Sequence, residues 1–248
     1  MTKLYRKSEL GFALMWIAIY VIGTSLADEA SRLIGIEKSV TCAFLALLTG
    51  ILSVWIAKSG LMKKFGLCSS PVNAGRFLYY IPLIILTSCN LWFGVRMNLS
   101  LTETILFAVS MLCVGFLEEI IFRGLLFRAM SRDNITSAII VSSLTFGIGH
   151  IVNLINGSGA DLVSNLCQIC YATAVGFLFV IIFHRGGSLI PCILTHSILN
   201  ALSVFSPEST GRQGIIVSVI ITVIEVVYTL ILLRTLPKPE TAKDESNE

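Results

Sequence analysis

Charged side chains are scarce in this chain. Asp, Glu, Lys and Arg make up 13% of its 248 residues, whereas a typical soluble domain has about 25%. Hydrophobic residues make up 55%, and the mean hydropathy is +0.85. This balance excludes an ordinary soluble domain and indicates an integral membrane protein. The basic residues form no patch interleaved with aromatic residues on a soluble module, so we expect no nucleic-acid partner.

The sequence also lacks an internal repeat, a soluble domain and the HExxH pattern of zinc proteases. Its seven cysteines are scattered, and most lie in apolar runs, where a thiol behaves as a small hydrophobic group. Cys167 and Cys170 have the spacing of a redox pair, but they lie in a predicted membrane helix. We therefore predict one transmembrane domain over residues 1–236, followed by a disordered cytoplasmic tail over residues 237–248.

Apolar runs long enough to cross a bilayer recur along the chain. A spanning helix needs about 20 mostly apolar residues. We therefore predict an all-α, polytopic integral membrane bundle of about eight transmembrane helices. The predicted spans are residues 10–27, 39–57, 77–95, 102–130, 135–152, 162–183, 188–205 and 214–233. Ser100 and Glu103 before the fourth span have the spacing of a capping box, in which each side chain bonds the other's backbone N–H.

The basic residues are unevenly distributed between alternate loops. If the N-terminus is cytoplasmic, the cytoplasmic segments hold 14 of the 18 Lys and Arg residues and the outer loops hold 4. Lys and Arg concentrate on the cytoplasmic side of membrane proteins. We therefore predict a multi-pass protein of the cell membrane with both termini in the cytoplasm. The first apolar run is longer than the core of a signal peptide, about 7–15 residues, so we interpret it as a retained helix.

Polar side chains interrupt the apolar spans in three groups. The groups are Glu118, Glu119 and Arg123 on the fourth span, His150 on the fifth, and His196 and Asn200 on the seventh. A charged residue at the centre of a bilayer costs about 2.5–3.5 kcal/mol on insertion scales, so such residues usually face the bundle interior and often mark function. With a rise of about 1.5 Å per residue, the three groups reach overlapping depths. We therefore predict that they meet in one site.

A spacing of four residues recurs within these groups. It relates Glu119 to Arg123, Phe146 to His150, and His196 to Asn200. Residues four apart share one helix face, so Glu119 and Arg123 can form an internal ion pair. Glu118 lies about 100° away on the helical wheel and is free for another role. The alternative is that these polar residues only hold helices together through hydrogen bonds.

In this order, the groups resemble the motifs of one protease family. Residues 118–123 match EExxxR, residues 146–150 match FxxxH, and residues 196–200 match HxxxN. Over a catalytic core of about residues 100–205, they are similar to the CAAX prenyl endopeptidase and bacteriocin-processing family (CPBP, or Abi) of intramembrane glutamic proteases. The resemblance implies an endopeptidase that uses activated water to hydrolyse a peptide bond of a membrane-associated protein or peptide, such as a prenylated CAAX protein or a bacteriocin precursor.

The resemblance also implies roles for the motif residues. Glu118 would be the general base, and His150 would orient or polarise the water. His196 and Asn200 would stabilise the oxyanion, since donors in a dry site suit a developing negative charge. The supporting residues would be Glu119, Arg123 and Phe146. No cofactor is implied, and the alternative is a zinc ion held by a Glu/His/His set.

Two functions from other classes stay open. A non-catalytic immunity or sensor-regulating protein could use the same fold and act on a regulatory membrane-protein partner. Glu225 on the last predicted span shares its helical spacing with Ser218, Thr222 and Thr229. This stripe could be an ion or proton site of a transporter, or simply pack inward. The expected partners of a protease are the lipid bilayer and a membrane-associated protein or peptide substrate.

Overall fold

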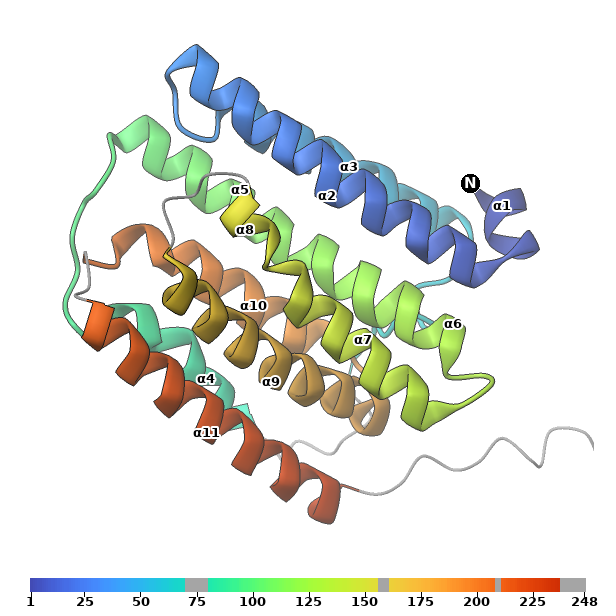
Figure 1. Ribbon diagram of the computed structural model, residues 1–248. Helices are drawn as coiled ribbons and strands as arrows, with labels where there is room; N and C mark the ends of the chain where they lie inside the picture. The colour runs from blue at the N-terminus through green and yellow to red at the C-terminus, as the bar shows by residue number, and fades with distance from the viewer. Residues whose placement is uncertain (70–79, 156–160, 208–210, 237–248) are drawn as a thin grey trace, which may run out of the picture.

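The computed structural model describes residues 1–69, 80–155, 161–207 and 211–236 (Figure 1). These residues form a bundle of helices and contain no strand. The predicted all-α, polytopic membrane bundle is therefore confirmed. The predicted disordered tail, residues 237–248, lies outside the described residues.

Long helices alternate with short helical turns along the chain. The α-helices are α1 (Thr2–Lys7), α2 (Glu9–Ile34), α3 (Ser39–Lys58), α4 (Ile81–Ser88), α5 (Leu101–Glu119), α6 (Arg128–Met130), α7 (Ile135–Gly149), α8 (Val152–Ile155), α9 (Leu162–Gly186), α10 (Ile190–Leu202) and α11 (Gly211–Thr235). The other turns are the 3-10 helices η2 (Cys89–Leu91) and η4 (Ser203–Phe205) and the π-helix η3 (Ile120–Phe127).

Six helical stretches in the described part are long and apolar enough to cross a membrane. They are Glu9–Ile34, Ser39–Lys58, Leu101–Met130, Ile135–Leu154, Leu162–Gly186 and Gly211–Thr235. Two shorter apolar helices, Ile81–Leu91 and Ile190–Phe205, fall in the third and seventh predicted spans. Each predicted span thus contains an apolar helix, although the third begins in residues that are not described. A helix of 10–17 residues is shorter than the hydrocarbon core of about 30 Å, at about 1.5 Å per residue.

The helices pack in layers (Figure 1). α2 and α3 lie together on one side of the bundle, and α11 lies on the opposite side. The N-terminus, the turn after α6 and the last turn of α11 all lie at the same end. The first and last described residues therefore lie at the same end of the bundle, and the assignment of that end to the cytoplasm stays a prediction.

The fourth predicted span begins with the expected capping box and then changes from an α-helix to a π-helix. The Ser100 hydroxyl accepts from the Glu103 N–H, and the Glu103 carboxylate accepts from the Ser100 N–H, so the capping box is confirmed. α5 then continues as the π-helix η3, in which all eight residues are buried. π turns inside α-helices are frequent at functional sites. The polar pair at the end of α5 therefore sits where the span changes from α to π.

Glycines allow the helices that carry the polar groups to approach closely. A Cβ at Gly115 on α5 would lie 2.5 Å from the Ser197 backbone nitrogen on α10. A Cβ at Gly147 on α7 would lie 2.8 Å from the Thr173 backbone nitrogen on α9. Small residues at such crossings let membrane helices make close contacts. The contact at Gly115 places His196, the neighbour of Ser197, against the end of α5.

We expect Gly115→Ala to separate α5 from α10 and to lower stability and activity together. Overpacking of this kind costs about 1–3 kcal/mol. The measurement is thermal unfolding of the purified protein in detergent. Gly50→Ala on α3 is the matched control, because a Cβ there would meet nothing within 4 Å, and Ala favours a helix over Gly. Equal melting temperatures for the two variants would contradict the close approach.

Candidate functional site

His196 on α10 links the two acidic residues of α5. Its Nδ1 lies 2.9 Å from Glu119 Oε1, and its Nε2 lies 3.5 Å from Glu118 Oε2. A carboxylate can only accept a hydrogen bond, so the ring donates through Nδ1 to Glu119. Groups from the fourth and seventh predicted spans therefore meet, as their matching depths predict.

Glu119 and Arg123 form the ion pair that their spacing predicts. Arg123 Nη1 lies 3.0 Å from Glu119 Oε1, and both side chains are 0% exposed. The guanidinium also lies over the Phe146 ring, 4.1 Å from its centroid, and 5.6 Å from the Phe179 centroid. Glu119 thus accepts from both Arg123 and His196. Its role in this arrangement is to hold the imidazole in one orientation.

Glu118 points towards α2 and has a partner that the motifs do not include. The Tyr20 hydroxyl donates to Glu118 Oε1 at 2.6 Å. Tyr20 lies in the middle of α2 and is buried. The sequence offered one signal for it, because a phenol in the middle of an apolar span is a polar group that usually needs a hydrogen-bond partner. Tyr20 is not among the predicted site residues.

The Phe146 ring contacts several of the other site residues. Its ring is edge-on to His150, with centroids 5.6 Å apart, and to His196, with centroids 5.7 Å apart. The backbone around His150 is fixed from α9, where the Asn165 side-chain amide donates to the His150 carbonyl at 2.9 Å. Phe146 therefore holds two imidazoles and the Arg123 guanidinium at set positions.

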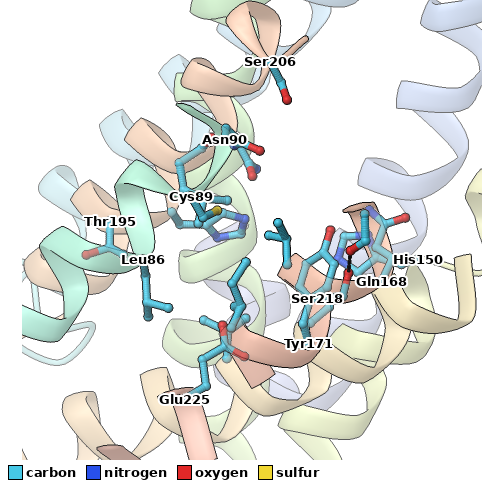
Figure 2. A pocket seen from close by; sticks show the side chains of 18 of the residues that line it. Leu86, Cys89, Asn90, His150, Gln168, Tyr171, Thr195, Ser206, Ser218 and Glu225 are labelled. Atoms are coloured by element: carbon cyan, nitrogen blue, oxygen red, sulfur yellow. Dashed lines mark hydrogen bonds between the residues drawn. The ribbon is translucent and has the colours of Figure 1, made fainter. Parts of the chain in front are cut away.

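A cavity of about 230 Å³ borders the site on the side of α9, α10 and α11 (Figure 2). Three of the predicted site residues, His150, His196 and Asn200, line it together with Phe146. Figure 2 shows Glu225 on a different wall from His150. The remaining lining is largely apolar and includes Phe179 and Leu199 among others. The cavity has the mixture of an apolar wall and a few polar groups that suits an organic ligand.

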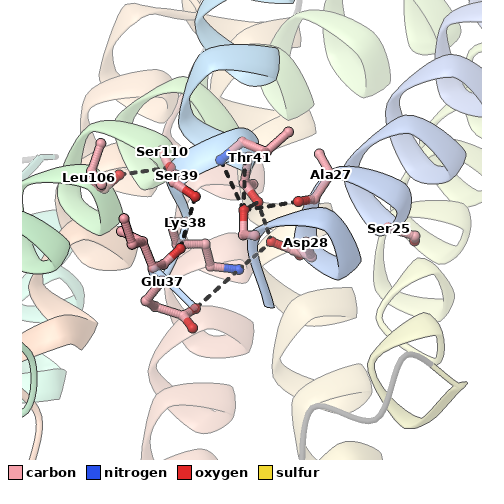
Figure 3. A network of polar contacts seen from close by, with 12 residues as sticks. Ser25, Ala27, Asp28, Glu37, Lys38, Ser39, Thr41, Leu106 and Ser110 are labelled. Atoms are coloured by element: carbon pink, nitrogen blue, oxygen red, sulfur yellow. Dashed lines mark hydrogen bonds and ion pairs between the residues drawn. The ribbon is translucent and has the colours of Figure 1, made fainter. Parts of the chain in front are cut away.

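Glu118 borders a second cavity of about 120 Å³, on the side of α2. The side chains of Tyr20, Thr24, Ser25 and Asp28 line this smaller cavity along one face of α2. Towards the C-terminal end of α2, Asp28 accepts from Lys38 at 2.7 Å and from Thr41 at 2.6 Å, and these bonds connect α2 to α3 (Figure 3).

The two cavities share a wall. Phe146 and His150 line both of them. Glu118 lines the smaller cavity, whereas His196 and Asn200 line the larger one. The predicted site residues are therefore adjacent, but they are divided between two compartments rather than gathered in one.

The described residues do not form a metal site. No group of three or more His, Cys, Asp or Glu side chains in the described ranges is arranged to hold a metal ion. The set Glu118, His150 and His196, which the zinc alternative requires, is thus not placed as metal ligands. Both ring nitrogens of His196 face carboxylates instead.

The four polar residues spaced along α11 differ in their hydrogen bonding. The hydroxyls of Ser218, Thr222 and Thr229 each donate to the backbone carbonyl four residues earlier. They are therefore satisfied within their own helix. Glu225 is different, because it lines the larger cavity and is 2% exposed.

A family model matches the segment that carries this site. Residues 100–202 match the family model described as type II CAAX prenyl endopeptidase, Rce1-like. The matched segment runs from the start of α5 to the end of α10 and includes Glu118, His150, His196 and Asn200. No curated protein and no solved structure matches the chain. Residues 100–202 of this multi-pass membrane protein are therefore similar to the Rce1-like type II CAAX prenyl endopeptidases.

Proposed function

We propose that this protein is an intramembrane glutamic endopeptidase that hydrolyses a peptide bond of a membrane-associated protein or peptide. The observation that carries the proposal is the position of Glu118. One of its oxygens accepts from Tyr20, and the other lies 3.5 Å from His196 at the wall between the two cavities. A carboxylate held in this way can take a proton from a water molecule beside it.

The charges of the cluster suit this role. Two carboxylates, Glu118 and Glu119, face one guanidinium, Arg123, and one imidazole, His196. Along the cluster, acidic and basic side chains alternate in the order Arg123, Glu119, His196 and Glu118. Charges in a low-dielectric site persist only when they are paired. The cluster therefore places a basic side chain beside each carboxylate and holds Glu118 in position to act as a base.

Water and the peptide substrate occupy different cavities. Water reaches Glu118 along the polar face of α2, past Asp28, Ser25 and Thr24, while the peptide occupies the larger cavity. His150, in the shared wall, orients the water. Glu118 takes one water proton as the oxygen attacks the carbonyl carbon. The same proton then passes to the leaving amine when the C–N bond breaks.

The oxyanion forms on the side of the larger cavity. The Asn200 amide lines that cavity. Its N–H donates a hydrogen bond to the oxyanion, and the amide stays neutral throughout. The distance of 3.5 Å from His196 Nε2 to Glu118 is long for a hydrogen bond. Once Glu118 has taken the water proton, His196, which lines the same cavity as Asn200, stabilises the oxyanion together with the Asn200 amide. Glu119, Arg123 and Phe146 hold His196 in place for this step.

We further propose that the reaction needs no metal and that the protein lies in the cell membrane with both termini in the cytoplasm. The arrangement of the Glu118, His150 and His196 side chains supports the metal-free mechanism, because it is not that of a zinc site. The excess of Lys and Arg in alternate loops of the sequence supports the orientation. A regulatory membrane-protein partner belongs to the non-catalytic alternative, in which Glu118 would be dispensable.

The test of this function is a comparison of membrane peptides in cells that carry the wild-type protein, Glu118→Ala or no protein. We expect peptides with new ends that are present only with the wild-type protein. Their sequences identify the substrate. Identical peptide sets in all three strains, with normal membrane abundance of the protein, would favour the non-catalytic alternative.

A further inference from the structure

Glu225 has no role in the mechanism, yet it occupies a wall of the larger cavity (Figure 2). It lies on α11, outside residues 100–202, the segment that matches the family. Its side chain is almost completely buried, and its Oε2 has no hydrogen-bond partner among the described residues. A buried carboxyl group without a partner is costly in hydrocarbon, so such groups usually mark a ligand or ion pathway.

No basic side chain of the described residues pairs with Glu225, so a partner would have to be a molecule bound in the cavity. The ion pairs of the described residues do not include one between Glu225 and a Lys or Arg. Cys89 and Tyr171 interact electrostatically with Glu225. Neither of these residues is a cation. A bare metal ion is a poor fit as well, because no further acidic or imidazole ligands are grouped there in the described ranges.

The shape and lining of the cavity indicate the chemistry of the missing partner. The lining of the cavity is largely apolar and includes Phe179, Leu199, Val217 and Ile221. A long aliphatic stem can pack along such a surface while a charged group at its end reaches a carboxylate. Lys and Arg side chains have this form.

We propose that Glu225 selects the substrate by pairing with a Lys or Arg side chain of the peptide bound in the larger cavity. This inference rests on the proposed protease function and adds its substrate class. A hydrogen bond between two charged groups in a dry cavity is stronger than one between neutral groups. A neutral substrate leaves Glu225 unpaired, and the peptide that carries the cation is cleaved faster.

The experiment uses the full-length protein in liposomes with synthetic peptides. Each peptide is an apolar membrane segment that carries either Lys or Met at one scanned position. At one position, we expect the wild-type protein to have a kcat/KM for Lys about tenfold to hundredfold above that for Met, as the loss of a charged hydrogen bond predicts. In Glu225→Gln this ratio should fall to about 1. Gln is uncharged and similar in volume, so the fold is expected to tolerate it.

Charge reversal gives an independent readout. Glu225→Lys should disfavour the Lys peptide and favour a peptide with Glu at the same position. Thr222→Val, on the same helix but outside the lining of the cavity, is the matched control and should keep the wild-type ratio. The Glu225 inference is overturned if Glu225→Gln retains the wild-type ratio, or if no position gives the wild-type protein a preference for Lys. Cleavage that persists in Glu118→Gln would instead refute the catalytic mechanism, and the two failures are therefore distinguishable.

Discussion

Glu118→Gln should reach the membrane at normal abundance and cleave its peptide at a rate close to background. Gln keeps the volume of the side chain and can still accept from Tyr20 through its carbonyl oxygen, but it cannot take a proton from water. Loss of a general base typically costs about 10²–10⁴ in rate. The measurement is single-turnover cleavage by the purified protein in liposomes. Full activity of Glu118→Gln would refute the glutamic mechanism.

Two neighbouring variants separate catalysis from structure. Tyr20→Phe keeps the Glu118 carboxylate and removes only the hydrogen bond to it, so we expect a smaller loss of kcat than in Glu118→Gln. Glu119→Gln leaves the buried Arg123 without its counter-ion, which costs about 3–5 kcal/mol in comparable buried pairs. This variant should therefore give low yield and a low melting temperature. If Glu118→Gln were the variant that failed to fold, the assigned roles of the two carboxylates would be reversed.

Asn200→Ala should lower kcat by about 10²–10³ with little change in KM, which is the effect of removing one oxyanion donor. The amide lines the cavity in which the oxyanion develops, so its contribution appears in the transition state and not in substrate binding. Asn200→Asp should be at least as slow, because it presents a negative charge to the developing negative charge. The measurement is steady-state cleavage in liposomes, together with the amount of folded protein.

The partner in this step is His196, one turn away on α10. The double variant His196→Ala, Asn200→Ala should lose less activity than the product of the two single losses, because residues that act as one unit are not additive. Asn200→Ala could instead reduce only the abundance of the protein and leave kcat unchanged. The amide would then be a packing residue, and the oxyanion assignment would be wrong.

Local sequence spacing was enough to predict two contacts, of which one belongs to the site. The Ser100–Glu103 capping box and the Glu119–Arg123 ion pair join residues three or four positions apart. Within a helix, such residues are neighbours whatever the rest of the fold does. The apolar runs predicted the helices in the same way, since length and composition alone suit them to a bilayer.

The π-helix η3 could not be predicted from its residues. Its eight residues are buried on every side, so the hydrophobic pattern carries no period that would separate an i→i+5 from an i→i+4 hydrogen bond. Tyr20 is another case. It lies 98 residues from Glu118 in the chain, and only the packing of α2 against the span that carries Glu118 brings the phenol to the carboxylate.

Composition and helical spacing establish that this chain is a membrane helix bundle with three polar groups at matching depths. Depth follows from counting residues along a helix. The direction in which each side chain points depends on how the helices rotate and cross, which close contacts such as Gly115 against Ser197 set. Tertiary packing therefore decides that Glu118 faces the α2 cavity and Glu119 holds His196. It also decides that Phe146 and His150 separate the compartment of the base from that of Asn200, because these contacts join residues from different helices.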